Sequence, residues 1–209
     1  MELDDLVIYL RKRYSPNAII LHGSRARGNA FDHSDYDLEL IIEEPDLVRP
    51  EYYKGCALDV GGISQTEMIL KAGQTPIWPC LVLFDDGENL GECLVKRTHE
   101  AFRQGPSPLE GEQLENRFIF SKRLIQRIQG RGADPLVRFY YVGIFYERVL
   151  RYWCELNQQW TASVYLLLPR IATEDPVFYR LLKDLWTEDY QNAALKIHQH
   201  LFDNIKEKA

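Results

Sequence analysis

The hydrophobic and polar positions in the first half of the chain follow two different spacings. At residues 3–14 the apolar positions recur every three or four residues, which predicts an amphipathic helix. Residues 64–71 and 88–103 have the same helical spacing. Between the helices lie short apolar runs of strand length, at 18–22, 35–43, 56–61 and 80–84. The pattern therefore predicts a domain in which short strands alternate with short helices.

The second half of the chain has helical spacing throughout. Residues 104–108 hold a glycine and two prolines, which interrupt a helix and mark a boundary. After them the apolar spacing predicts five helices, at 110–129, 135–156, 162–172, 176–187 and 190–207. We therefore expect an α+β protein. A domain with a mixed sheet should span residues 1–105, and an all-α helical bundle should span 109–209.

The predicted helix at 135–156 has an unusual composition. Its residues 136–153 are apolar nearly all round, which is typical of a helix at the centre of a bundle. Glu147 is the one acidic residue within 136–153. It could act as a general base toward a substrate hydroxyl, or pair with Arg151 one turn later, which is the interpretation we favour. The aromatic residues of this helix could line a substrate pocket, but core packing is the more common role: Phe139, Tyr140, Tyr141, Phe145, Tyr146, Tyr152 and Trp153.

Composition and charge restrict the class of protein. The chain has 209 residues, of which 45% are hydrophobic and 27% charged, as in folded globular proteins. Its net charge of −6 argues against a broad nucleic-acid-binding surface. No apolar run reaches the length of a membrane span, and the N-terminal residues do not resemble a secretory signal. Four cysteines without metal-ligand spacing favour buried thiols in a reduced cytoplasm. We expect His198 and His200 to lie at the surface.

The candidate chemistry lies in residues 18–42. Gly23 and Ser24 follow an apolar strand and open a turn. Glycine lets backbone N–H groups approach a phosphate closely, and the serine hydroxyl can donate to a phosphate oxygen. Arg25 and Arg27 could add charge-assisted contacts or point to solvent. This segment therefore predicts a binding site for a triphosphate.

Two aspartates follow at the start of the next predicted strand. Asp35 and Asp37 are two residues apart, so a strand places both carboxylates on one face. Like charges this close are costly unless a cation joins them, and Mg²⁺ favours carboxylates combined with water and substrate phosphates. Asp59 lies in a later apolar strand and would join them if the two strands are neighbours. Two metal ions could then bind, about 4 Å apart.

The order of these features resembles the nucleotidyltransferase superfamily of the DNA polymerase β type. Within it, the small size, the compact Gly-Ser-Arg-Ala-Arg-Gly segment and the helical second half together look most like bacterial minimal nucleotidyltransferases and aminoglycoside nucleotidyltransferases. The resemblance implies that Gly23 and Ser24 bind a nucleoside triphosphate. It also implies that Asp35, Asp37 and Asp59 are catalytic and bind Mg²⁺ or Mn²⁺. The implied reaction moves a nucleoside monophosphate, with ATP as the expected donor, to a hydroxyl acceptor and releases pyrophosphate.

The acceptor is left open by the sequence. A polycationic small molecule such as an aminoglycoside would suit an acidic helical domain. A second hypothesis is an antitoxin-like protein that nucleotidylates or binds a partner protein. A third is an inactive regulatory domain, against which the three intact aspartates argue. The expected partners are a nucleoside triphosphate and a hydroxyl acceptor of unknown identity, without a membrane. A homodimer is also allowed.

Overall fold

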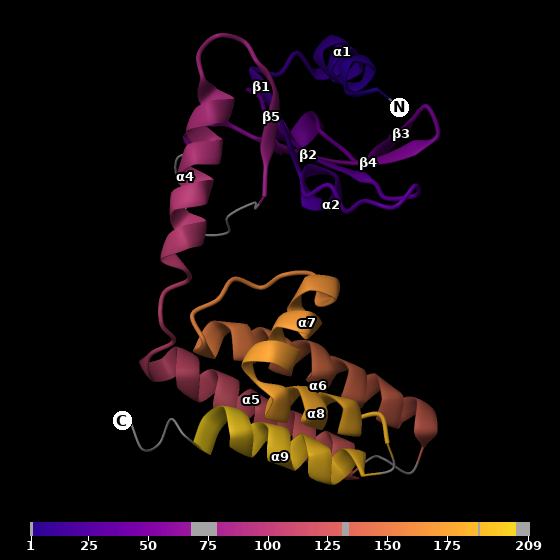
Figure 1. The fold of residues 1–209 in the computed structure, drawn as a ribbon, viewed down its shortest axis with the longest axis vertical. Coiled ribbons are helices and arrows are strands. Elements are labelled where there is room, and N and C mark those ends of the chain that lie inside the picture. Colours follow the sequence, from indigo (N-terminus) through magenta and orange to yellow (C-terminus); the bar gives the residue numbers. More distant parts are fainter. Residues whose placement is uncertain (1, 68–78, 131–133, 188, 204–209) are drawn as a thin grey trace. The chain divides into compact units, whose positions relative to one another are not determined.

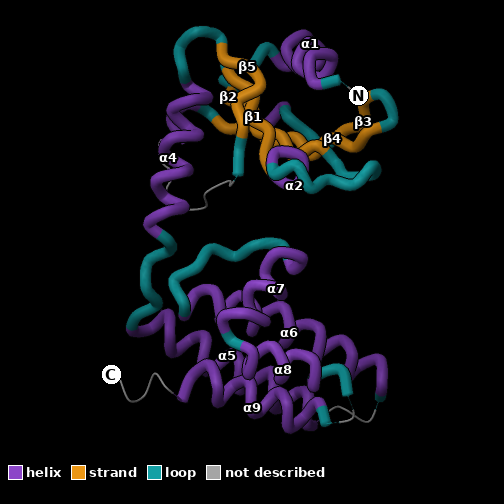
Figure 2. Tube along the Cα trace, in the orientation of Figure 1, coloured by secondary structure: helices purple, strands orange, loops and turns teal. Residues whose placement is uncertain are grey.

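The computed structural model describes residues 2–67, 79–130, 134–187 and 189–203. The chain divides into two compact units, Met1–Gln104 and Gly105–Ala209. We call them the N-terminal unit and the helical unit, and describe each by itself. In both Figure 1 and Figure 2 the strands belong to the N-terminal unit. None of the described helices is long and apolar enough to cross a membrane.

A five-stranded sheet forms the centre of the N-terminal unit (Figure 2). Its strand order is β3-β4-β2-β1-β5. The pair β2–β4 is parallel and the other pairs are antiparallel, so the predicted mixed sheet is confirmed. The strands are β1 Ala18–His22, β2 Tyr36–Ile41, β3 Glu51–Tyr53, β4 Cys56–Ile63 and β5 Leu81–Asp85.

Strand β3 was not predicted, because it has only three residues and only part of it is apolar. It pairs with β4 across a two-residue turn, Lys54–Gly55. Both turn residues have positive φ, +48° and +79°, which matches the twist of a tight hairpin. The hairpin adds an outer strand beside β4.

Helices cover the two faces of this sheet differently. On one face, α1 (Leu3–Tyr14) buries Leu6 and Leu10 against residues of β1, β2 and β4. On the other face, α4 (Leu90–Gln104) buries Leu90 and Leu94 against apolar residues at one end of the strands. The residues covered by α4 are Ala18, Ile20, Ile41 and Ile63. The rest of that second face is polar and holds the candidate site.

Short elements connect the strands. Helix α2 (Gly23–Ala26) follows β1, and the 3-10 helix η1 (Pro45–Leu47) follows β2. After β4, Ser64 and Glu67 form reciprocal capping hydrogen bonds: the Glu67 N–H donates to Ser64 Oγ (3.2 Å), and the Ser64 N–H donates to Glu67 Oε2 (3.3 Å). Residues 68–71 of the helix expected here lie outside the described residues.

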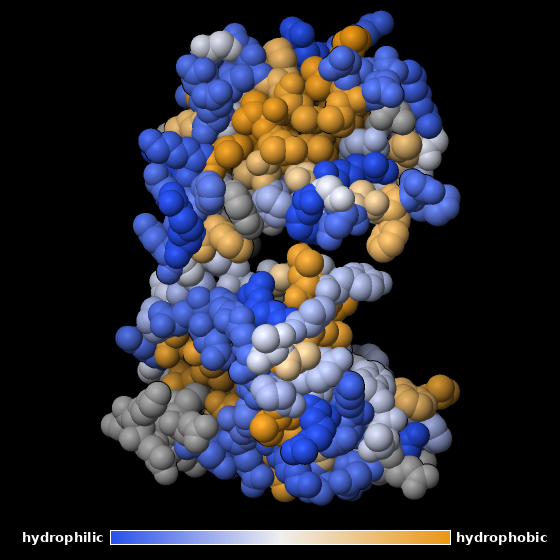
Figure 3. All heavy atoms as spheres, in the orientation of Figure 1, coloured by the Kyte–Doolittle hydropathy of each residue, from blue (hydrophilic) through white to orange (hydrophobic). Residues whose placement is uncertain are grey.

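The surfaces of the two units differ in character. On the face visible in Figure 3, hydrophobic residues gather over the strands beside α1, whereas the visible face of the helical unit is mostly hydrophilic. Exposed apolar residues of the N-terminal unit include Ile8 in α1 and Leu81 in β5.

The buried thiols of Cys80 and Cys154 have a pKa raised by burial to about 11, so both stay protonated at neutral pH.

The helical unit packs its helices around one hydrophobic core. The largest fully buried side chains of this core are Phe145, Phe178 and Phe202. Helices α6 and α8 each begin with proline after an aspartate whose side chain accepts a backbone N–H, from Leu136 and Phe178 respectively. Residues 204–207 of the expected last helix lie outside the described residues. The described helices are α5 Gly111–Gly130, α6 Pro135–Leu156, α7 Val164–Glu174, α8 Pro176–Asp184 and α9 Tyr190–Phe202.

Helix α6 is buried along only part of its length. Phe145 and Trp153 are at most 2% exposed, but Leu136 is 79% and Tyr140 64% exposed. The prediction of a helix that is central throughout was therefore wrong for its first turns. At 22 residues, α6 is about 33 Å long, whereas α7 and α8 have 11 and 9 residues and cover less of it.

The histidines of α9 are not simple surface residues. His198 is 4% exposed, and its Nδ1 lies 3.0 Å from Ser121 Oγ in α5. His200 is partly buried, and its Nε2 lies 2.7 Å from Asp175 Oδ2. The surface prediction was wrong because the ring partners come from distant parts of the chain, Ser121 in α5 and Asp175 between α7 and α8.

Candidate nucleotide and metal site

The register of the three central strands places three ionisable side chains in one row. His22 is opposite Asp37 across β1 and β2, and Asp37 is opposite Asp59 across β2 and β4. Directly opposed residues project from the same side of a sheet. The row lies on the sheet face that α4 covers in part. The apolar residues under α4 are at one end of the strands, and the row is toward the other end. The sequence could bring Asp59 to Asp35 and Asp37 only if β4 and β2 are neighbours, and the two strands are neighbours in the sheet.

Gly23 and Asp37 are in close contact. Gly23 has φ +69°, and a Cβ atom there would overlap Oδ2 of the Asp37 carboxylate. Only glycine fits both the backbone conformation and the space. The Gly-Ser turn and the acidic strand therefore meet at one point, as a site that binds phosphate and metal together requires.

Electrostatics at this point oppose the ionised form of Asp37. Burial raises the pKa of Asp37, and the neighbouring carboxylates of Asp35 and Asp59 raise it further. His22 and Arg27 act in the opposite direction, but the net pKa shift is upward. Asp35 and Asp59 themselves are exposed. A divalent cation between these carboxylates would replace repulsion with attraction.

His22 belongs to the site but was not a sequence candidate. Burial lowers the pKa of its imidazole, although the charges of Asp37 and Asp59 partly oppose this. The ring is therefore a neutral neighbour of the carboxylates near pH 7. A histidine directly before Gly23, at the end of an otherwise apolar strand, was the signal that could have identified it.

Glu39 is a second residue that sequence reasoning missed. It lies two positions after Asp37 on β2, and therefore on the same face. Its carboxylate lies against Gly61 of β4, where a Cβ atom would stand 3.0 Å from Oε2. The sequence signal was the alternation of acidic and apolar residues along β2.

Arg25 binds the backbone of the loop that leads into β2. Its Nε donates to the carbonyl oxygens of Ser34 (3.2 Å) and Asp35 (3.0 Å). Its guanidinium carbon lies 3.9 Å from the centre of the Tyr36 ring. These contacts hold the backbone beside Asp35 in place. The expected phosphate contact of Arg25 stays a prediction.

Arg27 has a different environment. Its Nε is buried and has no hydrogen-bond partner among the described residues. Its charge lowers the pKa of both His22 and Asp37, so it stands near the acidic row. An unsatisfied buried donor of this kind is suited to a phosphate oxygen. Helix α2 has only four residues, so individual N–H groups of the turn, more than a helix dipole, would contribute to anion binding.

The donor set fits a magnesium site that the substrate completes. Among the described residues, no three His, Cys, Asp or Glu side chains are grouped as metal ligands. Asp37 and Asp59 are nevertheless in register, and Asp35 is close enough to affect the pKa of Asp37. Mg²⁺ commonly takes one or two carboxylates and completes its shell with water and phosphate. The carboxylates present suit that pattern.

Glu147 lies in the helical unit, on α6. Its side chain is 68% exposed, and its nearest cation is Arg148, at 4.0 Å. The expected pair with Arg151 was wrong: Arg151 Nε donates to Glu155 Oε1 at 3.2 Å. Glu155 accepts hydrogen bonds from both Arg117 and Arg151, and its carboxylate is partly buried. A role for Glu147 as general base stays a prediction.

Comparison with known proteins agrees with this geometry. Residues 4–66 match the family model described as Polymerase beta, Nucleotidyltransferase. No curated protein matches the chain. The crystal structure of a nucleotidyltransferase-like protein from Exiguobacterium sibiricum 255-15 superimposes with a TM-score of 0.53. It covers 97% of this chain and 75% of that one at 13% identity, so the likeness is one of fold.

The matched range holds the whole row and the turn beside it. It contains the Gly-Ser turn, the two aspartates of the β2 region and the aspartate of β4. The fold of the N-terminal unit and the family match thus agree with the resemblance seen in the sequence. This unit therefore contains a segment, residues 4–66, that matches the nucleotidyltransferase domain of the Polymerase beta family.

Proposed function

We propose that this protein is a divalent-metal-dependent nucleotidyltransferase that transfers a nucleoside monophosphate to a hydroxyl group. The observation that carries the proposal is the Asp37 carboxylate, which rests on Gly23 and stands in register with Asp59. In one place, the turn that would bind phosphate meets the carboxylates that would bind metal.

Different residues would bind the triphosphate and the metal. The backbone at Gly23, the hydroxyl of Ser24 and the guanidinium of Arg27 would bind and orient the triphosphate. Asp35, Asp37 and Asp59 would hold Mg²⁺ or Mn²⁺. The metal supplies charge neutralisation and a lower pKa for the attacking hydroxyl.

Orientation of the triphosphate sets up in-line attack at the α-phosphorus. The acceptor oxygen forms a new bond to phosphorus as the bond to pyrophosphate breaks. The acceptor proton is taken up by a general base.

ATP is the proposed donor, and a small molecule with a hydroxyl group is the proposed acceptor. The net charge of −6 favours a cationic acceptor such as an aminoglycoside through long-range attraction. A protein acceptor is the competing hypothesis, and one experiment distinguishes the two.

The test identifies which molecule receives the α-phosphate of ATP. The protein is incubated with Mg²⁺ and ATP labelled at the α-phosphate, together with an aminoglycoside panel or a cell lysate. We expect label on a small molecule. Label on a protein would support the competing hypothesis, and absence of transfer with either Mg²⁺ or Mn²⁺ would contradict the proposed activity.

Calorimetric titration with ATP and Mg²⁺ tests the site itself. We expect Asp37→Asn and Asp59→Asn to weaken binding of the metal nucleotide at least tenfold. Asp46→Asn is the matched control, because Asp46 is an exposed aspartate of η1, away from the row. Equal binding by wild type and the two site variants would exclude this site.

A further inference from the structure

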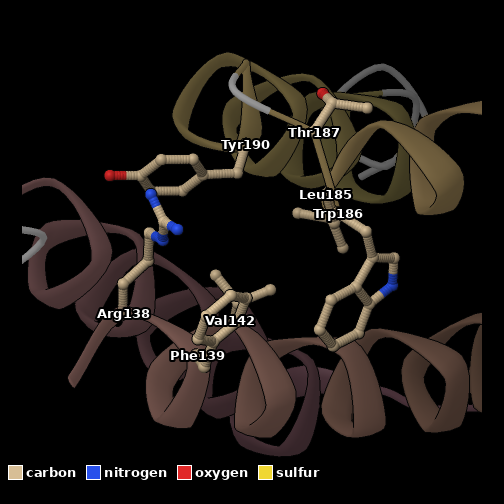
Figure 4. Close-up of a pocket in the computed structure, with 7 residues that line it drawn as sticks. All are labelled: Arg138, Phe139, Val142, Leu185, Trp186, Thr187 and Tyr190. Atoms are coloured by element: carbon tan, nitrogen blue, oxygen red, sulfur yellow. The ribbon is translucent and has the colours of Figure 1, made fainter. Parts of the chain in front are cut away.

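A pocket of about 220 Å³ opens on the helical unit, between α6, residues 185–187 and the start of α9 (Figure 4). Val142 and Leu185 supply aliphatic surface, and Phe139, Trp186 and Tyr190 supply aromatic surface. Figure 4 shows the Arg138 guanidinium beside the Tyr190 ring, with the Trp186 indole across the space. The lining residues are Arg138, Phe139, Val142, Leu185, Trp186, Thr187 and Tyr190.

The aromatic walls are unusually exposed. Phe139 is 52% and Trp186 53% exposed, although both are large rings. Such rings favour stacked or edge-on contact with another ring. Trp186 contacts Tyr146 edge-on, at 5.6 Å between ring centres, and this contact supports the orientation of its indole. The pocket thus offers preformed aromatic surface to a ligand.

Arg138 supplies the charge. Its guanidinium carbon lies 5.0 Å from the centre of the Phe139 ring and 5.1 Å from that of Tyr190. Its side chain forms no ion pair or hydrogen bond with any residue in the described ranges. A guanidinium held between two rings presents its N–H groups as a fork that matches carboxylate or phosphate oxygens. The pocket therefore combines aromatic walls with an available anion-binding group.

Another cavity in this unit lacks such an available group. It has a volume of about 410 Å³, and Glu155 and Asp175 are among its lining residues. Glu155 is engaged by Arg117 and Arg151. Asp175 accepts hydrogen bonds from Trp153 Nε1 and the backbone N–H of Phe178, and its Oδ2 also pairs with His200. These polar groups satisfy one another and form a structural network.

We propose that the pocket around Arg138 binds a small planar aromatic anion, a single ring system that carries a carboxylate or a phosphate. The ring stacks within the space between Trp186 and Tyr190, and the anion accepts hydrogen bonds from Arg138. The size supports a single ring system, because drug-sized ligands occupy pockets of roughly 300–1,000 Å³. The proposal does not depend on nucleotidyl transfer at the N-terminal unit.

The test uses three matched probes and the full chain, without nucleotide. The probes are 2-naphthoate, 2-naphthyl phosphate and neutral 2-naphthamide, titrated by ligand-observed NMR and calorimetry. We expect saturable binding of at least one anion, at least tenfold tighter than the amide. The anion that binds more tightly identifies the ligand as carboxylate or phosphate.

Variants assign the binding to this pocket. Arg138→Met should weaken anion binding at least tenfold and leave the amide unchanged. Arg138→Lys should fall between wild type and Arg138→Met, because it keeps the charge without the planar fork. Trp186→Leu should weaken all three probes. Arg123→Met, which removes an exposed arginine of α5, should match wild type.

Several results would overturn the proposal. These are no saturable binding of either anion, equal binding of anion and amide, or unchanged anion binding in Arg138→Met or Trp186→Leu. Circular dichroism of each variant confirms that the helical unit is folded before the titrations are compared.

Discussion

Gly23 shows at the scale of one residue how the site depends on backbone and space together. Its φ of +69° disfavours any side chain, and the space beside it is filled by the Asp37 carboxylate. Gly28 has a similar φ of +73°, but a Cβ atom there would meet nothing within 4 Å. A comparison of the two glycines therefore separates the cost of a left-handed backbone from the cost of overlap with the Asp37 carboxylate.

The first prediction compares Gly23→Ala with Gly28→Ala. Gly28→Ala should cost about 1–2 kcal/mol of the free energy of unfolding, the usual cost of a left-handed backbone with a side chain. Gly23→Ala should cost more and should also abolish binding of the metal nucleotide, since Asp37 must move. Urea unfolding and calorimetric titration measure both quantities, and equal losses in the two variants would contradict the overlap.

Asp175 is the second residue whose contacts have measurable consequences. Burial raises the pKa of its carboxyl, but the hydrogen bonds from His200, the Phe178 N–H and Trp153 together outweigh burial and lower the pKa. A lowered pKa in the folded state means that ionised Asp175 stabilises the fold above its unfolded pKa of about 3.9. That contribution is lost as the pH falls through the lower, folded pKa.

The second prediction follows from that sign. Asp175→Asn should destabilise the helical unit by about 1–3 kcal/mol near pH 7. The difference from wild type should shrink below about pH 4, where wild type loses the contribution of the ionised carboxylate. Asp134→Asn is the control, because Asp134 caps α6 through one backbone N–H and asparagine caps equally well. Unfolding curves measured from about pH 3 to pH 7, at intervals of about one pH unit, test this prediction. A stability difference between Asp175→Asn and wild type that does not change with pH would contradict it.

At the scale of elements, the loop between α2 and β2 is held by one side chain. Arg25 binds two carbonyl oxygens of this loop and stacks on Tyr36. The loop carries Asp35, whose charge acts on Asp37. Arg25 thus joins the Gly23-Ser24 turn to the start of β2 through backbone carbonyl groups.

The third prediction is that Arg25→Met destabilises the N-terminal unit by about 1.5–3 kcal/mol, the usual contribution of a hydrogen bond that involves a charged group. It should also weaken binding of the metal nucleotide, because Asp35 is less well positioned. Arg25→Lys should restore little, since lysine lacks the planar fork. Thermal unfolding and titration measure both effects, with the exposed Arg103→Met of α4 as control. Full nucleotide affinity in Arg25→Met would show that the loop needs no such support.

At the scale of the whole molecule, each unit has its own core. Clusters of buried residues under α1 and α4 belong to the N-terminal unit, and one larger cluster belongs to the helical unit. Separate cores make each unit a cooperative element in its own right.

The fourth prediction tests that independence. Phe178→Ala should cost the helical unit about 3–5 kcal/mol, because the ring is fully buried. Hydrogen exchange should then accelerate in α5 to α9 and stay unchanged in β1, β2 and β4. Ile20→Ala is the converse variant, with its effect limited to the N-terminal unit. Acceleration throughout the chain in either variant would contradict two separate cores.

The sequence by itself determined the features that depend on near neighbours in the chain. Apolar spacing located nearly all described helices and strands, because the helical and strand periods are local properties. It also placed the Gly23-Ser24 turn before an Asp-x-Asp pair, and that order indicated the resemblance with which the family match at residues 4–66 agrees. Among the described elements, the strand β3 and the 3-10 helix η1 were missed, because three residues are too few to show a period.

The tertiary structure alone decided which distant residues meet. The parallel pairing of β2 with β4 brings Asp59 to Asp37, and the pairing of β1 with β2 brings His22 to the same row. His198 is buried because Ser121, 77 positions away in sequence, supplies its polar partner. Such contacts depend on strand register and helix packing, and one local sequence pattern is compatible with several registers and packing arrangements. For this reason spacing could suggest the acidic site, while its geometry and the aromatic pocket at Arg138 required the folded chain.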